Sequence, residues 1–316
     1  MKSTGLRVAC LLIAIAVSAF GLSALGYTAS SRTEAFSVVA SFYPLYTAAL
    51  NVVGGCDGVA VSCLTPPSAG CLHDYQLSPS ERAALGGADL LLLNGAGMEA
   101  FLEPVLESLP SLTCVDTSVG LDLLSCEEHE HEHGQHHEHT VNEHLWLDPA
   151  RYAAQVSAIC EALCEALPEQ ADLFRENAAA YRQQIDALEA DFTALDLPFE
   201  HAVLFHDSVA YVAESFGLQT AGVIPLGEDQ AASAAELAAI ADAMRGKNVL
   251  LLYDAQYTAQ HETLGEYAAV SATVHWNTAV GPLVGVEAKD TWLEAMRRNL
   301  KTLEEVIEWV DVDYIA

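Results

Sequence analysis

Residues 169–195 read EQADLFRENAAAYRQQIDALEADFTAL, and their apolar positions alternate three and four residues apart. This spacing places an apolar face along one side of an α-helix. The face is formed by Phe174, Ala178, Tyr181, Ile185, Leu188, Phe192 and Leu195. At 1.5 Å per residue the segment predicts a single helix of about 40 Å. We expect this helix, within residues 168–196, to join two lobes as a stiff strut.

The segments on either side of this helix alternate between strand patterns and helix patterns. Buried strands are predicted at residues 36–43, 59–64, 88–93 and 112–115 in the first half, and at 202–205, 219–224 and 249–253 in the second. Helices are predicted between them, including residues 98–108 and 208–216. Ser78-Pro79-Ser80-Glu81 and Ser233-Ala234-Ala235-Glu236 are capping boxes, which mark helix starts. Each is followed by a glycine and an apolar strand, so the two halves have a similar build.

Strands that alternate with helices imply parallel sheets covered on both faces. The predicted fold class is therefore α/β, with two similar lobes of parallel sheets flanked by helices and joined by one long rigid helix. We expect an N-terminal lobe at residues 36–167 and a C-terminal lobe at residues 197–316.

Composition excludes some classes of partner. The chain has 316 residues, 52% of them hydrophobic, and a formal net charge of −31. Such an acidic surface repels nucleic-acid phosphates and anionic lipids and attracts cations. We therefore expect no nucleic-acid partner.

The first 26 residues resemble an export signal. Lys2 and Arg7 are basic, residues 8–25 are apolar, and Ala24-Leu25-Gly26 would serve as a cleavage site. The apolar stretch has about 18 residues, so an uncleaved N-terminal anchor is the alternative. Either reading predicts an extracytoplasmic protein, in the periplasm or at the cell surface.

Seven cysteines follow this segment, and an odd count leaves at least one unpaired in a monomer. Cys56 and Cys63 are the expected local pair, whereas Cys160 and Cys164 lie one helical turn apart with poor bridging geometry. No pair has the spacing of a zinc knuckle, so the cysteines are interpreted as structural.

Histidine is concentrated in one run. Residues 127–144 hold seven of the twelve histidines, interleaved with glutamate. This composition is typical of a metal-binding loop, and imidazole nitrogen suits zinc, copper and nickel, whereas calcium and magnesium prefer oxygen. With almost no apolar residue, the histidine-rich loop at 127–139 cannot build a core.

Two short motifs have simpler explanations than enzymatic ones. His129-Glu130-His131-Glu132-His133 satisfies the zinc-protease pattern HExxH, but alternating His and Glu do so by chance. Residues 95–100 match the dinucleotide pattern GxGxxA, for which a tight strand-to-helix turn is the preferred interpretation.

Three further histidines stand where a strand turns into a helix. His73 ends a Pro/Gly loop after a strand, His144 precedes a helix, and His206 directly follows the strand at 202–205. Ligands bind outside the carboxyl ends of parallel strands, so these three are candidate metal ligands.

The motifs around these histidines resemble the zinc- and manganese-specific solute-binding proteins of bacterial ABC importers. The similarity is carried by VVASFYP at 38–44, HDYQLSP at 73–79, NGAGME at 94–99, HLWLDP at 144–149 and FHDSVAY at 205–211. The resemblance implies a metal cleft between the two lobes, with His73, His144 and His206 as ligands.

The fourth ligand departs from the family pattern. The family places an aspartate after the strand that follows a Glu-x-Gln-Phe segment, which matches residues 254–257 here. Counting forward puts Asn277 at the aspartate position. One alternative is His275, which lies two residues earlier and so points to the same face of the strand. The other is a water molecule.

Together with these ligands, the resemblance implies a protein that captures Zn²⁺ and delivers it to a membrane ABC permease. Three imidazoles favour Zn²⁺, and Mn²⁺ would require more carboxylate. Asp148 and Asp207 are expected to orient imidazoles. We expect a monomer that catalyses no reaction. The alternatives are an exported zinc-dependent hydrolase or a metal-binding surface adhesin of the same fold.

Overall fold

A computed structural model describes residues 35–67, 69, 72, 75–125, 141–224, 232–257 and 262–314. The predicted signal or anchor, His73 and the histidine-rich loop at 127–139 lie outside the described residues. All elements discussed below belong to one compact unit, Phe36–Ala316. No helix in the described part of the chain is both long enough and apolar enough to span a bilayer.

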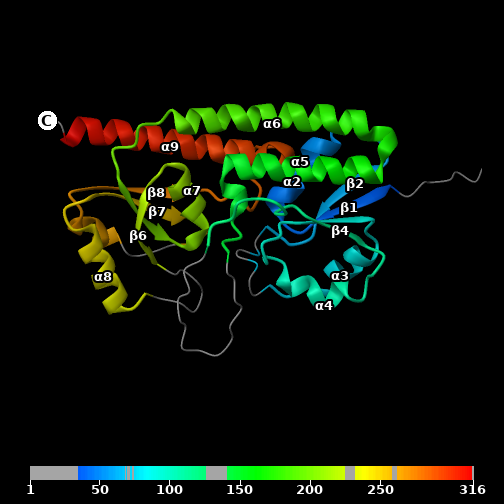
Figure 1. Cartoon of the computed structure of the whole chain (residues 1–316), viewed down its shortest axis with the longest axis horizontal. Helices are drawn as coiled ribbons and strands as arrows, with labels where there is room; N and C mark the ends of the chain where they lie inside the picture. The colour runs from blue at the N-terminus through cyan, green and yellow to red at the C-terminus, as the bar shows by residue number, and fades with distance from the viewer. Residues whose placement is uncertain are drawn as a thin grey trace, which may run out of the picture. The chain divides into compact units, whose positions relative to one another are not determined.

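The first half of the chain forms a four-stranded parallel sheet in the order β2-β1-β3-β4 (Figure 1). Its strands are β1 (Phe36–Ala40), β2 (Val59–Cys63), β3 (Leu90–Leu93) and β4 (Thr113–Asp116). Its helical segments are α2 (Tyr43–Val53), α3 (Pro79–Gly86), η1 (Ala100–Leu102) and α4 (Glu103–Leu106). Ser78 and Glu81 form the predicted capping box at the start of α3.

The second half repeats this topology in a parallel sheet of order β6-β5-β7-β8. Its strands are β5 (His201–Phe205), β6 (Gln219–Ile224), β7 (Asn248–Asp254) and β8 (Val270–Trp276). Its helical segments are η4 (Asp207–Val209), α7 (Ala210–Ser215), α8 (Ala234–Met244), η5 (Glu262–Tyr267), η6 (Ala288–Asp290) and α9 (Thr291–Tyr314). In both sheets the chain's first strand lies between its second and third, which confirms the prediction of two similar halves.

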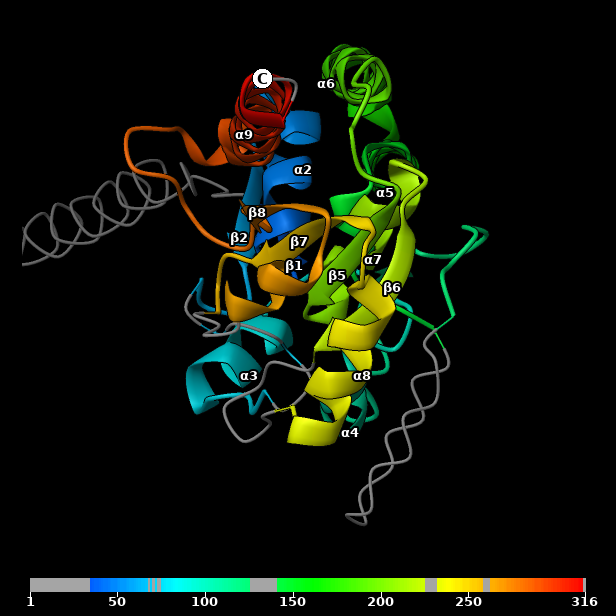
Figure 2. The same cartoon turned by 90° about the vertical axis from the view of Figure 1, so that its left-hand side faces the viewer.

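Each sheet is covered on both faces because successive strand residues point to opposite sides. In β5, Ala202 and Leu204 join the large core shared with α6 and α9, while Val203 and Phe205 join a separate core under α8. Figure 2 shows α8 and α9 on opposite sides of this sheet. The first sheet follows the same rule, with α2 on one face and α3 and α4 on the other.

The predicted long helix is α6 (Ala171–Thr193), and its buried side chains match the predicted apolar face from Phe174 to Phe192. It is preceded by α5 (Pro149–Ala166) and by a short 3₁₀ turn, η3 (Pro168–Gln170). Helices α5 and α6 pack against each other and share one continuous core with both sheets (Figure 1). The prediction of an α/β fold with a long helix between two sheets is confirmed.

Three predicted elements differ from the structure, and one of them is the helix expected at 208–216, which is divided into η4 and α7. The strand expected at 36–43 ends at Ala40, because Pro44 lies in the first turn of α2, where its fixed φ suits a helix. The helix expected at 98–108 is divided into η1 and the four-residue α4, which has Pro104 in its first turn. A proline has no N–H to continue the preceding hydrogen-bond ladder.

The expected Cys56–Cys63 disulfide is wrong. Among the described residues both cysteines are free thiols, as are Cys114, Cys160 and Cys164. Cys63 ends the extended strand β2, and a strand advances about 3.3 Å per residue, which carries it away from Cys56. The Sγ atoms of Cys160 and Cys164 lie 3.9 Å apart, at hydrogen-bond distance for two thiols and without a disulfide.

Candidate metal centre

His144 lies immediately before a 3₁₀ turn, η2 (Leu145–Leu147), that leads into α5. Its side chain is buried, at 4% exposure. His144 Nδ1 lies 3.0 Å from Asn142 Oδ1 and 3.9 Å from Glu143 Oε1. The ring of Trp146 packs beside it at a centroid distance of 5.3 Å. The imidazole is therefore held in place before any ion arrives.

His206 directly follows β5 and has an unusual backbone conformation, with φ of 89° and ψ of 142°. L-residues other than glycine rarely adopt such positive φ values, and the strain is often found at functional sites. The His206 side chain is 12% exposed. Tyr257 stacks on its ring at 5.0 Å, with an interplanar angle of 19°.

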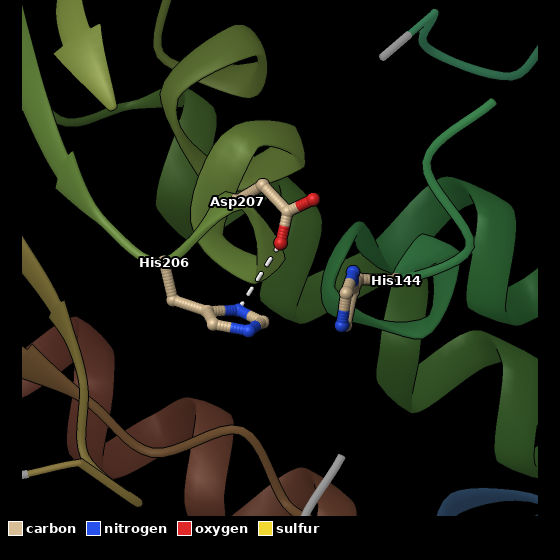
Figure 3. Close-up of side chains that lie close together, drawn as sticks. All are labelled: His144, His206 and Asp207. Atoms are coloured by element: carbon tan, nitrogen blue, oxygen red, sulfur yellow. Dashed lines mark ion pairs between the residues drawn. The ribbon is translucent and has the colours of Figure 1, made fainter. Parts of the chain in front are cut away.

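These two histidines, far apart in sequence, lie side by side in the structure. Their ring centroids are 5.4 Å apart and the rings are almost perpendicular, at 89°. Candidate ligand atoms of His144, His206 and Asp207 all lie within 4.8 Å of one another (Figure 3). Around a tetrahedral ion with bonds of about 2 Å, two ligand atoms lie about 3.3 Å from each other. A small inward movement is enough to form such a site.

Asp207 contacts the ring of its neighbour. Its Oδ1 lies 3.2 Å from His206 Nδ1, the contact drawn in Figure 3. Ser208 N donates to the same Nδ1 at 3.1 Å. These partners favour opposite tautomers, because a carboxylate accepts a hydrogen bond from a protonated Nδ1, whereas a backbone N–H donates a hydrogen bond to an unprotonated Nδ1. A metal bound at Nε2 leaves the proton on Nδ1, where the Asp207 carboxylate stabilises it.

A buried carboxylate holds the turn that carries His206. Asp254, 1% exposed, accepts a hydrogen bond from Ser208 Oγ at 2.8 Å and one from Gln256 N at 2.9 Å. Gln256 Nε2 in turn donates to Thr278 Oγ1 at 3.0 Å, and Trp146 Nε1 donates to the carbonyl of Thr278 at 2.9 Å. The loops after β5, β7 and β8 and the segment after His144 are thus connected.

Another buried carboxylate supports the segment before His144. Glu99 accepts hydrogen bonds from Ser41 Oγ, Asn94 N and Gly95 N. Burial raises the pKa of Glu99 to about 7, against the lowering effect of these three hydrogen bonds. Asn94 Nδ2 donates to the carbonyl of Glu143 at 2.8 Å, next to His144. The turn at 94–99 therefore supports the segment that carries His144, in keeping with its interpretation as a tight turn.

Asn277 and His275, the two candidates for the fourth ligand, are placed differently. Strand β8 ends at Trp276, so the rule that residues two apart point to the same face does not apply to Asn277. Asn277 is half-buried, and its Oδ1 accepts a hydrogen bond from Ala279 N at 2.9 Å. His275 is exposed, and its ring lies 4.9 Å from that of Tyr253. Among the His, Cys, Asp and Glu side chains of the described residues, the group formed by His144, His206 and Asp207 does not include His275.

Asn142 was not anticipated from the sequence. It contacts both His144 and the backbone of Asp207. The spacing Asn-x-His was a usable signal, because asparagine side chains commonly accept a hydrogen bond from the backbone two residues ahead. The contact with Asp207 has no local signal, since it joins segments on either side of α6.

Comparison with known proteins identifies the family. Residues 38–306 match the family model described as ZnuA, zinc-uptake complex component A, periplasmic. The chain belongs to this family. The resemblance found in the sequence motifs is confirmed. Homologues in the family are solute-binding proteins for metal transport and not enzymes, in agreement with the expectation that no reaction is catalysed.

Individual relatives are distant. Zinc-binding protein AdcA of Streptococcus pyogenes serotype M6 is 28% identical over 292 residues, covering 84% of this chain and 55% of the relative. The chain thus spans about half the length of the AdcA proteins that it matches. High-affinity zinc uptake system protein ZnuA of Bacillus subtilis is 29% identical over 322 residues, covering 96% of this chain and 97% of the relative.

The solved structures agree on the fold. The Zn(II)-bound ZnuA-like domain of Streptococcus pneumoniae AdcA superimposes with a TM-score of 0.66 at 23% identity. The match covers 86% of this chain and 99% of that domain. At this level of identity the likeness establishes the architecture, and the ligands must be argued from the residues of this chain.

Proposed function

We propose that this protein captures Zn²⁺ outside the cytoplasm and delivers it to a membrane ABC permease. The observation that carries the proposal is the convergence of His144 and His206, with Asp207, from loops on either side of α6. Support also comes from the relatives, which are named as zinc-binding and zinc-uptake proteins. A site with ligands from both halves can release its ion when the halves separate.

The chemistry of the donors favours zinc. Imidazole nitrogen is a preferred zinc ligand, and Mn²⁺ prefers oxygen. We assign His144, His206 and His73 as nitrogen ligands. His73 lies outside the described residues and is assigned from its motif. An oxygen from position 277, the Asp207 carboxylate or a water molecule completes the tetrahedron.

A direct test is equilibrium zinc titration of the purified protein against a chromophoric chelator, with esterase and peptidase assays on the same sample. We expect one tight site and no hydrolysis. Hydrolysis that depends on zinc would support the exported hydrolase instead. Delivery is tested in the source organism, where deletion of the gene should slow growth in zinc-depleted medium and added zinc should restore it.

The extracytoplasmic location is part of the proposal. The family model is described as periplasmic, and one relative is named as a lipoprotein. The basic and apolar residues at 1–26 are those expected of a signal or an anchor. Separation of cell extracts into soluble and membrane fractions, with N-terminal sequencing of the mature protein, would distinguish these two forms.

Deletion of residues 127–139 is expected to remove additional weaker zinc binding and to leave the tight site unchanged. His144 lies beyond the deletion, and the flanking segments are held by a Ser125–Val141 bridge and by Asn142 N donating to Leu124 O at 2.7 Å. Zinc stoichiometry and affinity of the deleted and full-length proteins provide the measurement. If the tight site is lost, the histidine-rich loop supplies one of its ligands.

Replacing Asn277 with Asp is expected to tighten zinc binding by about tenfold, because ligand charge strengthens cation affinity. Manganese binding should improve relatively more, since harder cations gain most from carboxylate. The new carboxylate can still accept from Ala279 N with one oxygen and offer the other to the ion. His275→Ala is the matched control and should bind zinc as the wild type does.

Parallel titrations of the two variants decide between the candidates. A sharp loss in His275→Ala, with no gain in Asn277→Asp, would identify His275 as the ligand. Unchanged affinity in both would exclude position 277 and leave Asp207 or water as the oxygen donor.

A further inference from the structure

Asn142 connects the two ligand segments through a single side chain. It is 2% exposed and lies two residues before His144. Its Oδ1 lies 2.9 Å from His144 N and 3.0 Å from His144 Nδ1. Its Nδ2 lies 2.9 Å from the backbone carbonyl oxygen of Asp207, directly after His206. One amide therefore contacts both candidate ligand segments.

The orientation of this amide follows from its backbone partners. A backbone N–H can only donate a hydrogen bond, so the atom facing His144 N must be the amide oxygen. A backbone carbonyl can only accept, so the atom facing Asp207 O must be the amide nitrogen. Reversing the amide would break both contacts.

The amide orientation in turn determines the protonation of His144. Because Asn142 Oδ1 is an acceptor, His144 Nδ1 must carry a proton to bond with it. In a neutral imidazole the other nitrogen, Nε2, then holds the lone pair that a metal requires. The Glu143 carboxylate, 3.9 Å from Nδ1, favours the same proton position. The ring is thereby prepared to coordinate through Nε2 without exchanging its proton.

We propose that Asn142 is a positioning residue that holds His144 in its Nδ1–H tautomer and sets its spacing to His206. The inference rests on the proposed function, because it assumes that both histidines bind the ion. Through Nδ2 the same side chain holds the Asp207 carbonyl, and so restrains the strained turn at His206.

The backbone of Asn142 is held as firmly as its side chain. Tyr211 Oη donates to Asn142 O at 2.7 Å and accepts from Leu124 N at 3.1 Å. Asn142 N donates to Leu124 O at 2.7 Å. With the main chain fixed, the amide cannot move away from His144 without losing its contacts, as a positioning role requires.

Two substitutions separate the contact of Asn142 with His144 from its contact with Asp207. Asn142→Leu has a similar size and removes both the acceptor for His144 and the donor for Asp207. Asn142→Asp keeps the acceptor but sets a carboxylate oxygen against the Asp207 carbonyl. We expect zinc affinity to fall about 10- to 100-fold in Asn142→Leu, the range for residues that orient metal ligands, and by a smaller factor in Asn142→Asp.

The tautomer is read directly in the metal-free protein by two-bond ¹⁵N–¹H NMR of the imidazole nitrogens. We expect His144 to be protonated at Nδ1 in the wild type and in Asn142→Asp, and to populate the Nε2–H form in Asn142→Leu. Zinc affinity is measured by chelator competition on the same samples. Asn177→Leu is the control, since its amide joins α6 to the carbonyls of Val52 and Gly54. It should leave both readouts unchanged.

Two results would overturn the inference. One is a wild-type His144 protonated at Nε2 in the absence of metal. The other is wild-type zinc affinity in a folded Asn142→Leu protein. Absence of tight zinc binding in the wild type would instead contradict the proposed function, and the NMR comparison would still show whether Asn142 controls the His144 tautomer.

Discussion

Replacing His206 with alanine or glycine is expected to weaken zinc binding at least about 100-fold, since even residues that only orient a ligand contribute 10- to 100-fold. The two variants should differ in stability. Position 206 has φ of 89°, which glycine adopts without the steric cost of a Cβ atom. In the metal-free state His206→Gly should therefore be more stable than His206→Ala by roughly 1–3 kcal/mol.

Chelator competition measures the affinity, and urea unfolding of the metal-free variants measures the stability difference. His201→Ala is the control, because His201 begins the same strand and lies outside the group of candidate ligands. It should retain wild-type zinc affinity. Tight zinc binding by either His206 variant would refute the assignment, and equal stability of the alanine and glycine variants would show that the positive φ relaxes on substitution.

Trp292→Ala is expected to destabilise the protein by about 3–5 kcal/mol, the usual loss for a large buried aromatic side chain. Trp292 is the second residue of α9 and is fully buried. Its ring stacks on Tyr152 of α5 at 4.0 Å, and its Nε1 donates to the carbonyl of Trp146 at 2.9 Å. The substitution therefore opens a cavity where α9 meets α5, and leaves a buried carbonyl without its donor.

Urea unfolding of three variants separates these effects. Trp292→Phe keeps most of the ring and loses the hydrogen bond, so it should lose about 1–3 kcal/mol. Trp309→Ala, on the same helix at 45% exposure, should lose roughly 1 kcal/mol or less. If Trp292→Ala and Trp309→Ala were equally stable, Trp292 would not be central to the packing of α9.

Much of the fold could be predicted because its signals are local. Ser78 with Glu81 and Ser233 with Glu236 satisfy helix N-termini within one turn, so their spacing is readable in the sequence. The apolar face of α6 is equally periodic. Helix α9 was not predicted. It packs across to the first half, where Thr291 Oγ1 lies 3.4 Å from Tyr43 Oη of α2. Such contacts between distant segments have no sequence period.

In the candidate site, too, features with a local signal could be predicted and contacts between distant segments could not. His144 and His206 were selected because each stands at a βα turn, and parallel strands bring such turns to one edge. The residues that contact these two histidines were predicted only in part. Asp207 was expected to orient an imidazole and lies 3.2 Å from His206 Nδ1, whereas Asn142 was missed. The role of Asn142 depends on Asp207, which approaches it only in the folded chain.

The sequence by itself determined the alternation of strands and helices, the long helix between the halves and the histidines at the strand ends, because each depends on neighbours within one or two turns. The tertiary structure alone decided that His144 and His206 meet within 5.4 Å, that His206 adopts a positive φ and that Cys56 and Cys63 remain apart. The first of these features arises when segments from both halves are packed together, and the geometry of that packing is set by the whole chain.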